Sequence, residues 1–366
     1  MQTAPLRIAL IGYGYVGKTF HAPLIRATPG LELSLIGSSD AAKVQRDLPG
    51  MRVEANMAAA VSASDIDLVV IASPNDTHAP LAAAALRAGK HVVVDKPFTL
   101  DLAQARELAG LARDTGKLLS VFQNRRWDSD FLALQALLRQ GRLGEVVHFE
   151  SQFDRFRPVV QARWREGDGP GAGIWYDLGP HLVDQALTLF GLPQRVSGHI
   201  ASQRQGTCSP DWAHVVLDYG RRQAVLHASV LVAGGVPRFA VHGTAGSWIK
   251  YGLDQQEAQL KAGMQPGAPG WGQDAEPATL YVGDTGVIEP IAVPAGDYGR
   301  YYAAVRDAIG HGAANPVTPM QALAVMAVIE AAMASATSGQ AQPLALSEAE
   351  RREATADWQA QGAIPR

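Results

Sequence analysis

The chain is poor in the residues that several broad classes of protein need. It has one cysteine, Cys208, among 366 residues, so it forms no internal disulfide and offers no cluster of thiolate ligands. Lysine and arginine together number 32, against 35 aspartates and glutamates, and this balance lacks the basic excess of nucleic-acid-binding proteins. We therefore expect no metal site, no nucleic-acid partner and a reducing compartment.

The sequence also lacks segments that direct or anchor a chain to a membrane. Its first residues pass directly into a strand-like stretch, without a basic region, a long apolar run or a small-residue cleavage site. No stretch approaches the length that spanning a bilayer requires. With 47% hydrophobic and 18% charged residues, the composition is typical of a globular protein. We expect a soluble cytoplasmic protein without a membrane partner.

Strand-like and helix-like segments alternate through the first third of the chain. LRIALIG and DIDLVVIASP are apolar runs of strand length, and a helical pattern such as PLAAAALRAG follows each of them. This alternation predicts a parallel sheet with helices on both faces, and right-handed crossovers favour a doubly wound arrangement. We predict an α/β protein whose residues 1–123 form a Rossmann domain.

The pattern changes beyond this domain. EVVHFESQFDRF alternates as a half-buried strand does, and further strand-like runs follow between short glycine turns. They predict an α+β domain over residues 124–340 with a large, mainly antiparallel open sheet. VTPMQALAVMAVIEAAMASATSG predicts a helix with Thr318 as its cap and Pro319 at its first position. The capping box SEAE predicts a helix in a C-terminal tail over residues 341–366.

GYGYVG places glycines at Gly12, Gly14 and Gly17, between the first predicted strand and a helix. In this context the spacing indicates a dinucleotide site. The first glycine allows a tight turn, the second a close approach to a pyrophosphate, and the third close packing of helix on strand. An ordinary strand-to-helix turn is the alternative. The cofactor-binding residues predicted from this loop are Gly12, Tyr13, Gly14, Tyr15, Val16 and Gly17.

The end of the second predicted strand bears on which nucleotide is bound. NAD sites usually place a carboxylate here to hold the ribose hydroxyls, whereas this chain has Ser38 and Ser39, with Asp40 slightly later. Hydroxyl groups can donate to a 2′-phosphate that a carboxylate would repel, and Lys43 follows on the next helix. We predict NADP as the cofactor. NAD is the alternative, because Asp40 can turn back toward the ribose.

Polar residues follow two further strands of the predicted sheet. SPNDTH and DKP stand at the carboxyl ends of strands, where open α/β sheets bind their ligands. Pro97 restricts the backbone of Lys96, and a partly desolvated lysine can exchange a proton near neutrality. A solvated lysine and an exposed helix-start histidine are the alternatives. The cofactor-binding residues predicted here are Ser73, Pro74, Asn75, His78, Asp95, Lys96 and Pro97.

GPGAGIWYDLGPHLVDQALTLFG places Asp177 and His181 around a predicted helix start, with Pro180 in the first turn of the helix. The two side chains are then near enough to face one pocket. Histidine is the side chain best matched to proton transfer at physiological pH. A helix-capping aspartate and a histidine satisfied within the first turn are the structural alternatives.

Taken together, these motifs resemble the Gfo/Idh/MocA family of nicotinamide-dependent sugar and polyol oxidoreductases. GYGYVG, SPNDTH, DKP and DLGPH occur in the family's order and spacing over nearly the whole chain. QNRRWDSDF, YDLGPHLVDQ and DRFRPVVQARWRE look most like the NADP-dependent scyllo-inositol dehydrogenase branch. The chain departs from the family at Asp95, where glutamate is usual, and this leaves the role of Asp95 open.

The resemblance implies a sheet domain through which subunits assemble as homodimers or homotetramers. It also implies a cis bond between Lys96 and Pro97, with His181 as general base and with Lys96 and Asp177 binding and polarising the reacting hydroxyl. The implied reaction oxidises a secondary hydroxyl of a cyclic polyol or sugar to the ketone, or runs in reverse. Candidates for holding the substrate are Arg125, Arg155, Arg157, Trp164 and Tyr176.

Other interpretations of the sequence remain. The arginines can be surface residues, and Trp164 can be ordinary packing. A non-catalytic sensor can bind the nucleotide on this fold, although it would not need Lys96, Asp177 and His181 together. A redox-assisted glycosidase or a reductase of a non-sugar carbonyl can share the same motifs.

Overall fold

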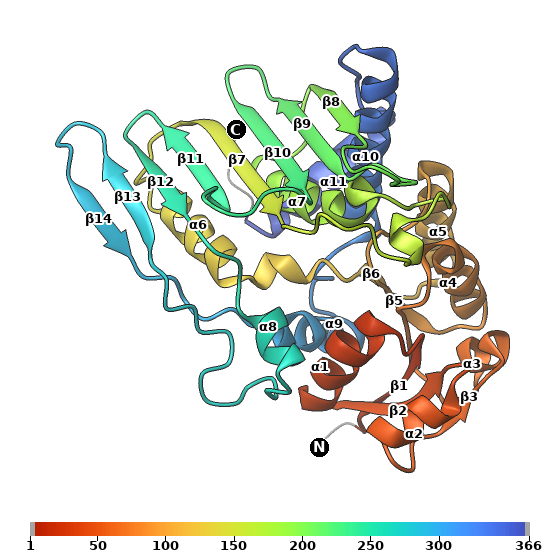
Figure 1. The fold of residues 1–366 in the computed structure, drawn as a ribbon. Helices are drawn as coiled ribbons and strands as arrows, with labels where there is room; N and C mark the ends of the chain where they lie inside the picture. Colours follow the sequence, from red (N-terminus) through yellow and green to blue (C-terminus); the bar gives the residue numbers. More distant parts are fainter. Residues whose placement is uncertain (1–3, 363–366) are drawn as a thin grey trace. The chain divides into compact units, whose positions relative to one another are not determined.

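The computed structural model describes residues 4–362 and divides into two compact units (Figure 1). The N-terminal unit comprises the residues up to Trp127, Gln255–Gly272 and Asp297–Leu323, and the C-terminal unit comprises Asp128–Asp254, Gln273–Gly296 and the residues from Ala324 onward. The outer ends of the first and last predicted domains, residues 1–3 and 363–366, lie outside the described residues.

The N-terminal unit is built on a parallel sheet in the order β3-β2-β1-β4-β5-β6. Its strands are β1 (Leu6–Ile11), β2 (Leu31–Gly37), β3 (Val53–Glu54), β4 (Leu68–Ile71), β5 (His91–Val94) and β6 (Leu119–Val121). The central strand β4 is buried at every position, as a parallel strand covered on both faces must be. The strand order reverses between β1 and β4, and this is the point at which open α/β sheets bind ligands. The predicted Rossmann sheet is confirmed.

Helices from both halves of the chain complete this unit. They are α1 (Ala22–Ala27), α2 (Ala41–Asp47), α3 (Met57–Ser62), α4 (His78–Arg87), α5 (Leu102–Thr115), α8 (Gln256–Lys261) and α9 (Gly299–His311). A π-helical turn, Gly17–His21, precedes α1. Tyr301 of α9 is fully buried, and its hydroxyl donates to Ser120 Oγ of β6 at 2.9 Å. The core of the N-terminal unit therefore includes residues from late in the sequence.

The C-terminal unit is built on a second sheet in the order β14-β13-β12-β11-β7-β10-β9-β8. Its strands are β7 (Val146–Asp154), β8 (Arg195–Ala201), β9 (Trp212–Asp218), β10 (Gln223–Ser229), β11 (Phe239–Gly243), β12 (Gly246–Lys250), β13 (Ala278–Val282) and β14 (Ile288–Ile291). All neighbours pair antiparallel except β7 and β10. The prediction of a mainly antiparallel sheet is confirmed.

One face of this sheet packs against helices. The helices of the unit are α6 (Ser129–Arg139), α7 (Ile174–Phe190), α11 (Glu348–Ala360) and the part of α10 (Pro319–Ser338) from Ala324 onward. Burial alternates along β9, with every second residue fully covered, because successive side chains of a strand point to opposite faces. Phe149, Phe190 and Phe239 meet between the sheet and α7. α11 begins at the predicted capping box of Ser347 and Glu350.

Among the described residues, α10 is the one helix long and apolar enough to cross a membrane, judged by length and composition. The expectation that no stretch approaches this length is therefore wrong. In its most apolar 18-residue window, 72% is buried inside the protein, as in a core helix. Its small side chains permit close packing: a Cβ added to Gly198 of β8 would lie 2.5 Å from the carbonyl oxygen of Ala332.

The helix that carries Asp177 and His181 begins earlier than the sequence predicts. α7 starts directly after Gly173, whose φ is 93°, and Pro180 therefore lies inside the helix and not in its first turn. The amide of Asp177 donates to the carbonyl oxygen of Gly173 at 3.1 Å, which adds a turn before the proline. Asp177 and His181 are thus one turn apart on the same face of α7.

Candidate functional site

The glycine loop after β1 has the geometry of a dinucleotide turn. Gly12 has a φ of 96°, and a Cβ there would lie 2.6 Å from the carbonyl oxygen of Ala72. A Cβ on Gly17 would lie 2.1 Å from the carbonyl oxygen of Gly12, whereas one on Gly14 would meet no atom within 4 Å. The fold itself thus requires glycine at positions 12 and 17, whereas Gly14 leaves open space beside the backbone. These residues fit a nucleotide pyrophosphate at Gly14.

Glu257 of α8 connects the glycine loop with another predicted site residue. Tyr15 donates from its hydroxyl to one oxygen of the Glu257 carboxylate at 3.0 Å, and Arg125 Nη2 lies 3.0 Å from the other. Lys261 also pairs with Glu257, at 2.7 Å. Burial raises the pKa of the Tyr15 hydroxyl. Arg125, predicted to hold substrate, therefore forms a largely buried ion pair within the N-terminal unit. Tyr13 is buried and Val16 is half-buried.

The end of β2 presents hydroxyl groups, and its acid is engaged by the next helix. Asp40 is the N-cap of α2, where its carboxylate accepts a hydrogen bond from the amide of Lys43 at 2.9 Å. The amide of Asp40 donates to Ser38 Oγ at 3.2 Å. Ser39 is exposed, and Lys43 lies in the first turn of α2. The capping bond turns the carboxylate of Asp40 toward the start of α2.

The loops after β4 and β5 are joined by His78. Its Nδ1 lies 2.8 Å from the carbonyl oxygen of Pro97, and its Nε2 lies 3.0 Å from that of Ser73. His78 is 1% exposed, so the histidine that sequence places at the nicotinamide side is enclosed between the two loops. Asn75 is also buried, and Pro74 immediately precedes it. The peptide bond between Lys96 and Pro97 is cis, and Lys96 is half-buried.

Asp95, which precedes the lysine, is a buried carboxylate. Burial alone would raise its pKa, but the adjacent His21 ring and the charge of Lys96 hold the pKa below its ordinary value. His21 Nε2 lies 3.8 Å from Asp95 Oδ1, and its Nδ1 lies 2.5 Å from the hydroxyl of Tyr302. Sequence reasoning missed His21 and Tyr302. Their contacts join segments more than 200 residues apart, and no local pattern indicates them.

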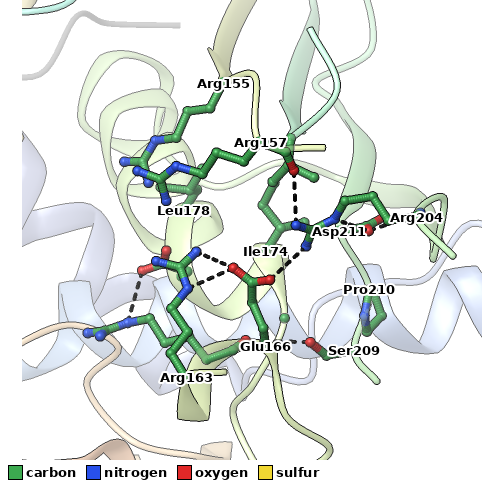
Figure 2. A pocket seen from close by; sticks show the side chains of 14 residues that line it. Arg155, Arg157, Arg163, Glu166, Ile174, Leu178, Arg204, Ser209, Pro210 and Asp211 are labelled. Atoms are coloured by element: carbon green, nitrogen blue, oxygen red, sulfur yellow. Dashed lines mark hydrogen bonds and ion pairs between the residues drawn. The ribbon is translucent and has the colours of Figure 1, made fainter. Parts of the chain in front are cut away.

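Asp177 lines a polar pocket in the C-terminal unit (Figure 2). Arg165 Nε lies 3.4 Å from Asp177 Oδ1, and this aspartate is half-buried. His181 lies one turn further along α7 and is 5% exposed. The pocket walls come from the β7 end, the segment before α7 and the loop before β9. Its lining residues are Arg155, Arg157, Arg163, Arg165, Glu166, Gly173, Ile174, Asp177, Leu178, Arg204, Ser209, Pro210, Asp211 and Val230.

The pocket includes some predicted substrate residues and adds others. Arg155 and Arg157, both predicted to hold the substrate, line the pocket. Trp164 and Tyr176 are not among its described lining residues; the ring of Trp164 is 42% exposed, with the Arg165 guanidinium 4.4 Å from its centre. Sequence reasoning missed most of the charged residues of the pocket. They are Arg163, Arg165, Glu166, Arg204 and Asp211.

Both halves of the chain match models of one known protein family. Residues 6–123 match a family model described as the NAD-binding Rossmann fold of an oxidoreductase family, and residues 135–346 match the C-terminal alpha/beta domain of the same family. The chain belongs to the Gfo/Idh/MocA oxidoreductase family. The predicted family and the prediction of an oxidoreductase are thereby confirmed. The Rossmann match also supports the expected nicotinamide cofactor.

Individual members of the Gfo/Idh/MocA family align over most of the chain. The uncharacterized oxidoreductase YdgJ of Escherichia coli (strain K12) is 54% identical over 333 residues, which is 90% of this chain and 96% of that protein. The scyllo-inositol 2-dehydrogenase (NADP(+)) IolW of Bacillus subtilis (strain 168) is 38% identical over 334 residues, 90% of this chain and 93% of that protein. A crystal structure from Klebsiella pneumoniae superimposes with a TM-score of 0.92 at 56% identity, covering 97% and 100% of the two chains.

Proposed function

We propose that this oxidoreductase is an NADP(H)-dependent dehydrogenase that oxidises a secondary hydroxyl of a cyclic polyol or sugar to the ketone, or reduces that ketone. The observation that carries the proposal is the placement of Asp177 and His181 one turn apart on α7, with Asp177 in the wall of a polar pocket. The scyllo-inositol 2-dehydrogenase among the relatives supports a scyllo-inositol-like substrate.

The proposed chemistry needs one proton acceptor and groups that stabilise an alkoxide. When bound, a nicotinamide nucleotide supplies the hydride acceptor. We assign proton removal from the hydroxyl to His181, because imidazole is the side chain suited to this step near neutral pH. Asp177 would hold the hydroxyl of the substrate. Lys96 would stabilise the developing negative charge on oxygen, for which a preorganised cation is effective.

NADP is the cofactor that the end of β2 favours. The Asp40 carboxylate already accepts the Lys43 amide as a helix cap, so it is less available to the ribose hydroxyls that define an NAD site. Ser39 can donate a hydrogen bond to a 2′-phosphate, and Lys43 supplies positive charge on the following helix. The NADP(+)-dependent relative adds support.

A cofactor-by-substrate panel tests the proposal. Formation of reduced nicotinamide is followed with NADP⁺ and with NAD⁺, against inositol isomers and common aldoses. We expect turnover with a polyol or sugar and at least a tenfold preference for NADP⁺ in kcat/KM. Release of a free sugar without net cofactor reduction would point instead to a redox-assisted glycosidase. Nucleotide binding without turnover of any alcohol or ketone would contradict the proposal.

A further inference from the structure

We infer that the pocket beside Asp177 binds an anionic substituent, so that the preferred substrate is a sugar or polyol carrying a carboxylate or a phosphate ester. The inference rests on the proposed function and narrows its substrate class from neutral to charged compounds. It depends on the balance of charge in the pocket, on the position of Arg157 and on the size of the cavity.

The pocket holds more positive charge than its own carboxylates neutralise, because five arginines line it against three acids. Arg204 takes up two of these acids: its Nη2 lies 3.1 Å from Glu166, and its Nε lies 2.8 Å from Asp211. Arg163 shares Glu166 at 2.6 Å. Burial alone would raise the pKa of Glu166, but the amide of Gln161 and the two arginines lower the pKa. Glu166 is therefore ionised and already paired with two arginines of the pocket wall.

Arg157 brings a positive charge that no acid of the protein matches. Among residues 4–362, no carboxylate forms an ion pair with its side chain. Its backbone is nevertheless held on both sides, because its amide donates to Val230 at 2.7 Å and its carbonyl oxygen accepts from Arg204 at 3.0 Å. The side chain is thus presented to the pocket from a fixed backbone.

Arg155 is placed in the same way, two residues earlier. Its amide donates to the carbonyl oxygen of Ser229 at 2.9 Å, and the intervening Phe156 bridges Leu231 on the neighbouring segment. Alternate residues of an extended chain project to one face, and both arginines line the pocket. In Figure 2 their guanidinium groups point the same way. Two guanidinium groups on one face add their positive potentials, and this favours the binding of an anion near Arg157.

The size of the cavity suits a single charged group. Its volume is about 30 Å³, and one water-sized group needs roughly 10–15 Å³ on this scale. The cavity therefore admits two or three atoms such as the oxygens of a carboxylate, and the ring of the substrate would remain outside it. A guanidinium matches the planar carboxylate with two parallel hydrogen bonds, which are about twice as strong as bonds to a neutral hydroxyl.

The first test compares compounds that differ only in this charge. Rates are measured with D-glucose, D-glucuronate and D-glucose 6-phosphate, with D-galactose and D-galacturonate, and with neutral inositols, each with both nucleotides. We expect an acid or a phosphate ester to exceed its neutral partner at least tenfold in kcat/KM, and the better of the two identifies the anion. Turnover confined to neutral compounds would overturn the inference while the proposed function stands. Absence of any alcohol oxidation would instead remove the proposed function.

The second test determines whether the side chain of Arg157 binds the anionic group of the substrate. We expect Arg157→Gln to raise KM for the anionic substrate at least tenfold and to lower the ratio of kcat/KM between the anionic substrate and its neutral partner by a similar factor. Arg352→Gln, which removes an exposed charge on α11, is the matched control and should leave both unchanged. Direct titration of the protein with D-glucuronate in the presence of reduced nucleotide reports binding apart from turnover. Equal affinity of wild type and Arg157→Gln for the acid would overturn the assignment.

Discussion

The carboxylate of Asp40 accepts a hydrogen bond from the backbone amide of Lys43, 2.9 Å away. This bond commits the first acid after β2 to the start of α2, at the place where an NAD site would use a carboxylate. The hydroxyl groups of Ser38 and Ser39 precede it. We therefore expect the choice between NADP and NAD to depend on whether the hydroxyl groups of Ser38 and Ser39 or the carboxylate of Asp40 face the ribose.

Introducing a carboxylate at the end of β2 should reverse the proposed preference for NADP⁺ over NAD⁺. We expect Ser39→Asp to lower kcat/KM with NADP⁺ at least tenfold, because a carboxylate repels the 2′-phosphate. The value of kcat/KM with NAD⁺ should stay the same or rise. Initial rates with both nucleotides measure this. Ser64→Asp adds the same charge at an exposed position of the same unit and serves as the control. An unchanged ratio in Ser39→Asp would argue against the assigned position of the 2′-phosphate.

Two glycines of the loop should respond differently to the same added methyl group. In Gly17→Ala the Cβ would lie 2.1 Å from the carbonyl oxygen of Gly12, so we expect a loss of about 2 kcal/mol in the free energy of unfolding. In Gly14→Ala the methyl group meets no protein atom within 4 Å, so stability should hold while nucleotide affinity falls about tenfold or more. Urea unfolding and fluorescence titration with NADPH separate the two effects. Full nucleotide affinity in Gly14→Ala would place the pyrophosphate elsewhere.

Lys96 is expected to act on the substrate and not on the fold. Lys96→Met keeps the length of the side chain and removes its charge, so we expect kcat to fall about a hundredfold or more, as losses of transition-state charge stabilisation do. The melting temperature should stay close to that of the wild type, which separates lost turnover from lost folding. A variant with full turnover would show that the assignment of Lys96 is wrong.

Asp154 should make stability depend on pH. Burial raises the pKa of this carboxyl to about 6, against the opposing effects of the Ser229 amide and Arg238. The folded state then binds its proton more tightly than the unfolded state does, so stability is lost as pH rises from about 4 to about 6. Water screens part of this effect. We therefore expect the free energy of unfolding of Asp154→Asn to rise by about 1–2 kcal/mol relative to that of the wild type between pH 4 and pH 7. Urea unfolding at several pH values measures this difference. If the free energy of unfolding changed with pH in the same way in both proteins, the prediction would be wrong.

Local patterns in the sequence determined the elements and the position of the nucleotide loop. Apolar runs such as LVVI, each followed by a helical pattern, predict buried strands of a parallel sheet, and Gly12 and Gly17 occupy places where a Cβ would collide with backbone. The capping box of Ser347 and Glu350 and the cap of Asp101 on α5 are equally local. These features depend on backbone sterics and on neighbours within a few residues, so a single sequence contains the information for them.

The helix start before Asp177 shows where local reasoning failed. A run of glycines followed by a proline predicts a late helix start, yet α7 begins at Ile174 and includes Pro180. The amide of Ile174 donates to the carbonyl oxygen of Pro210 at 2.8 Å, a bond to a residue that lies far along the chain. This tertiary contact stabilises a turn that local propensity disfavours.

Charge pairing was decided by the tertiary structure alone. The sequence shows 32 basic and 35 acidic residues, but not that Arg204 pairs with both Glu166 and Asp211 while Arg157 pairs with no carboxylate of the described chain. In the same way, α8 and α9 join the N-terminal unit although they follow it by more than 120 residues. Ion pairs and core contacts depend on distances of a few ångströms between distant segments, and only the folded chain sets those distances.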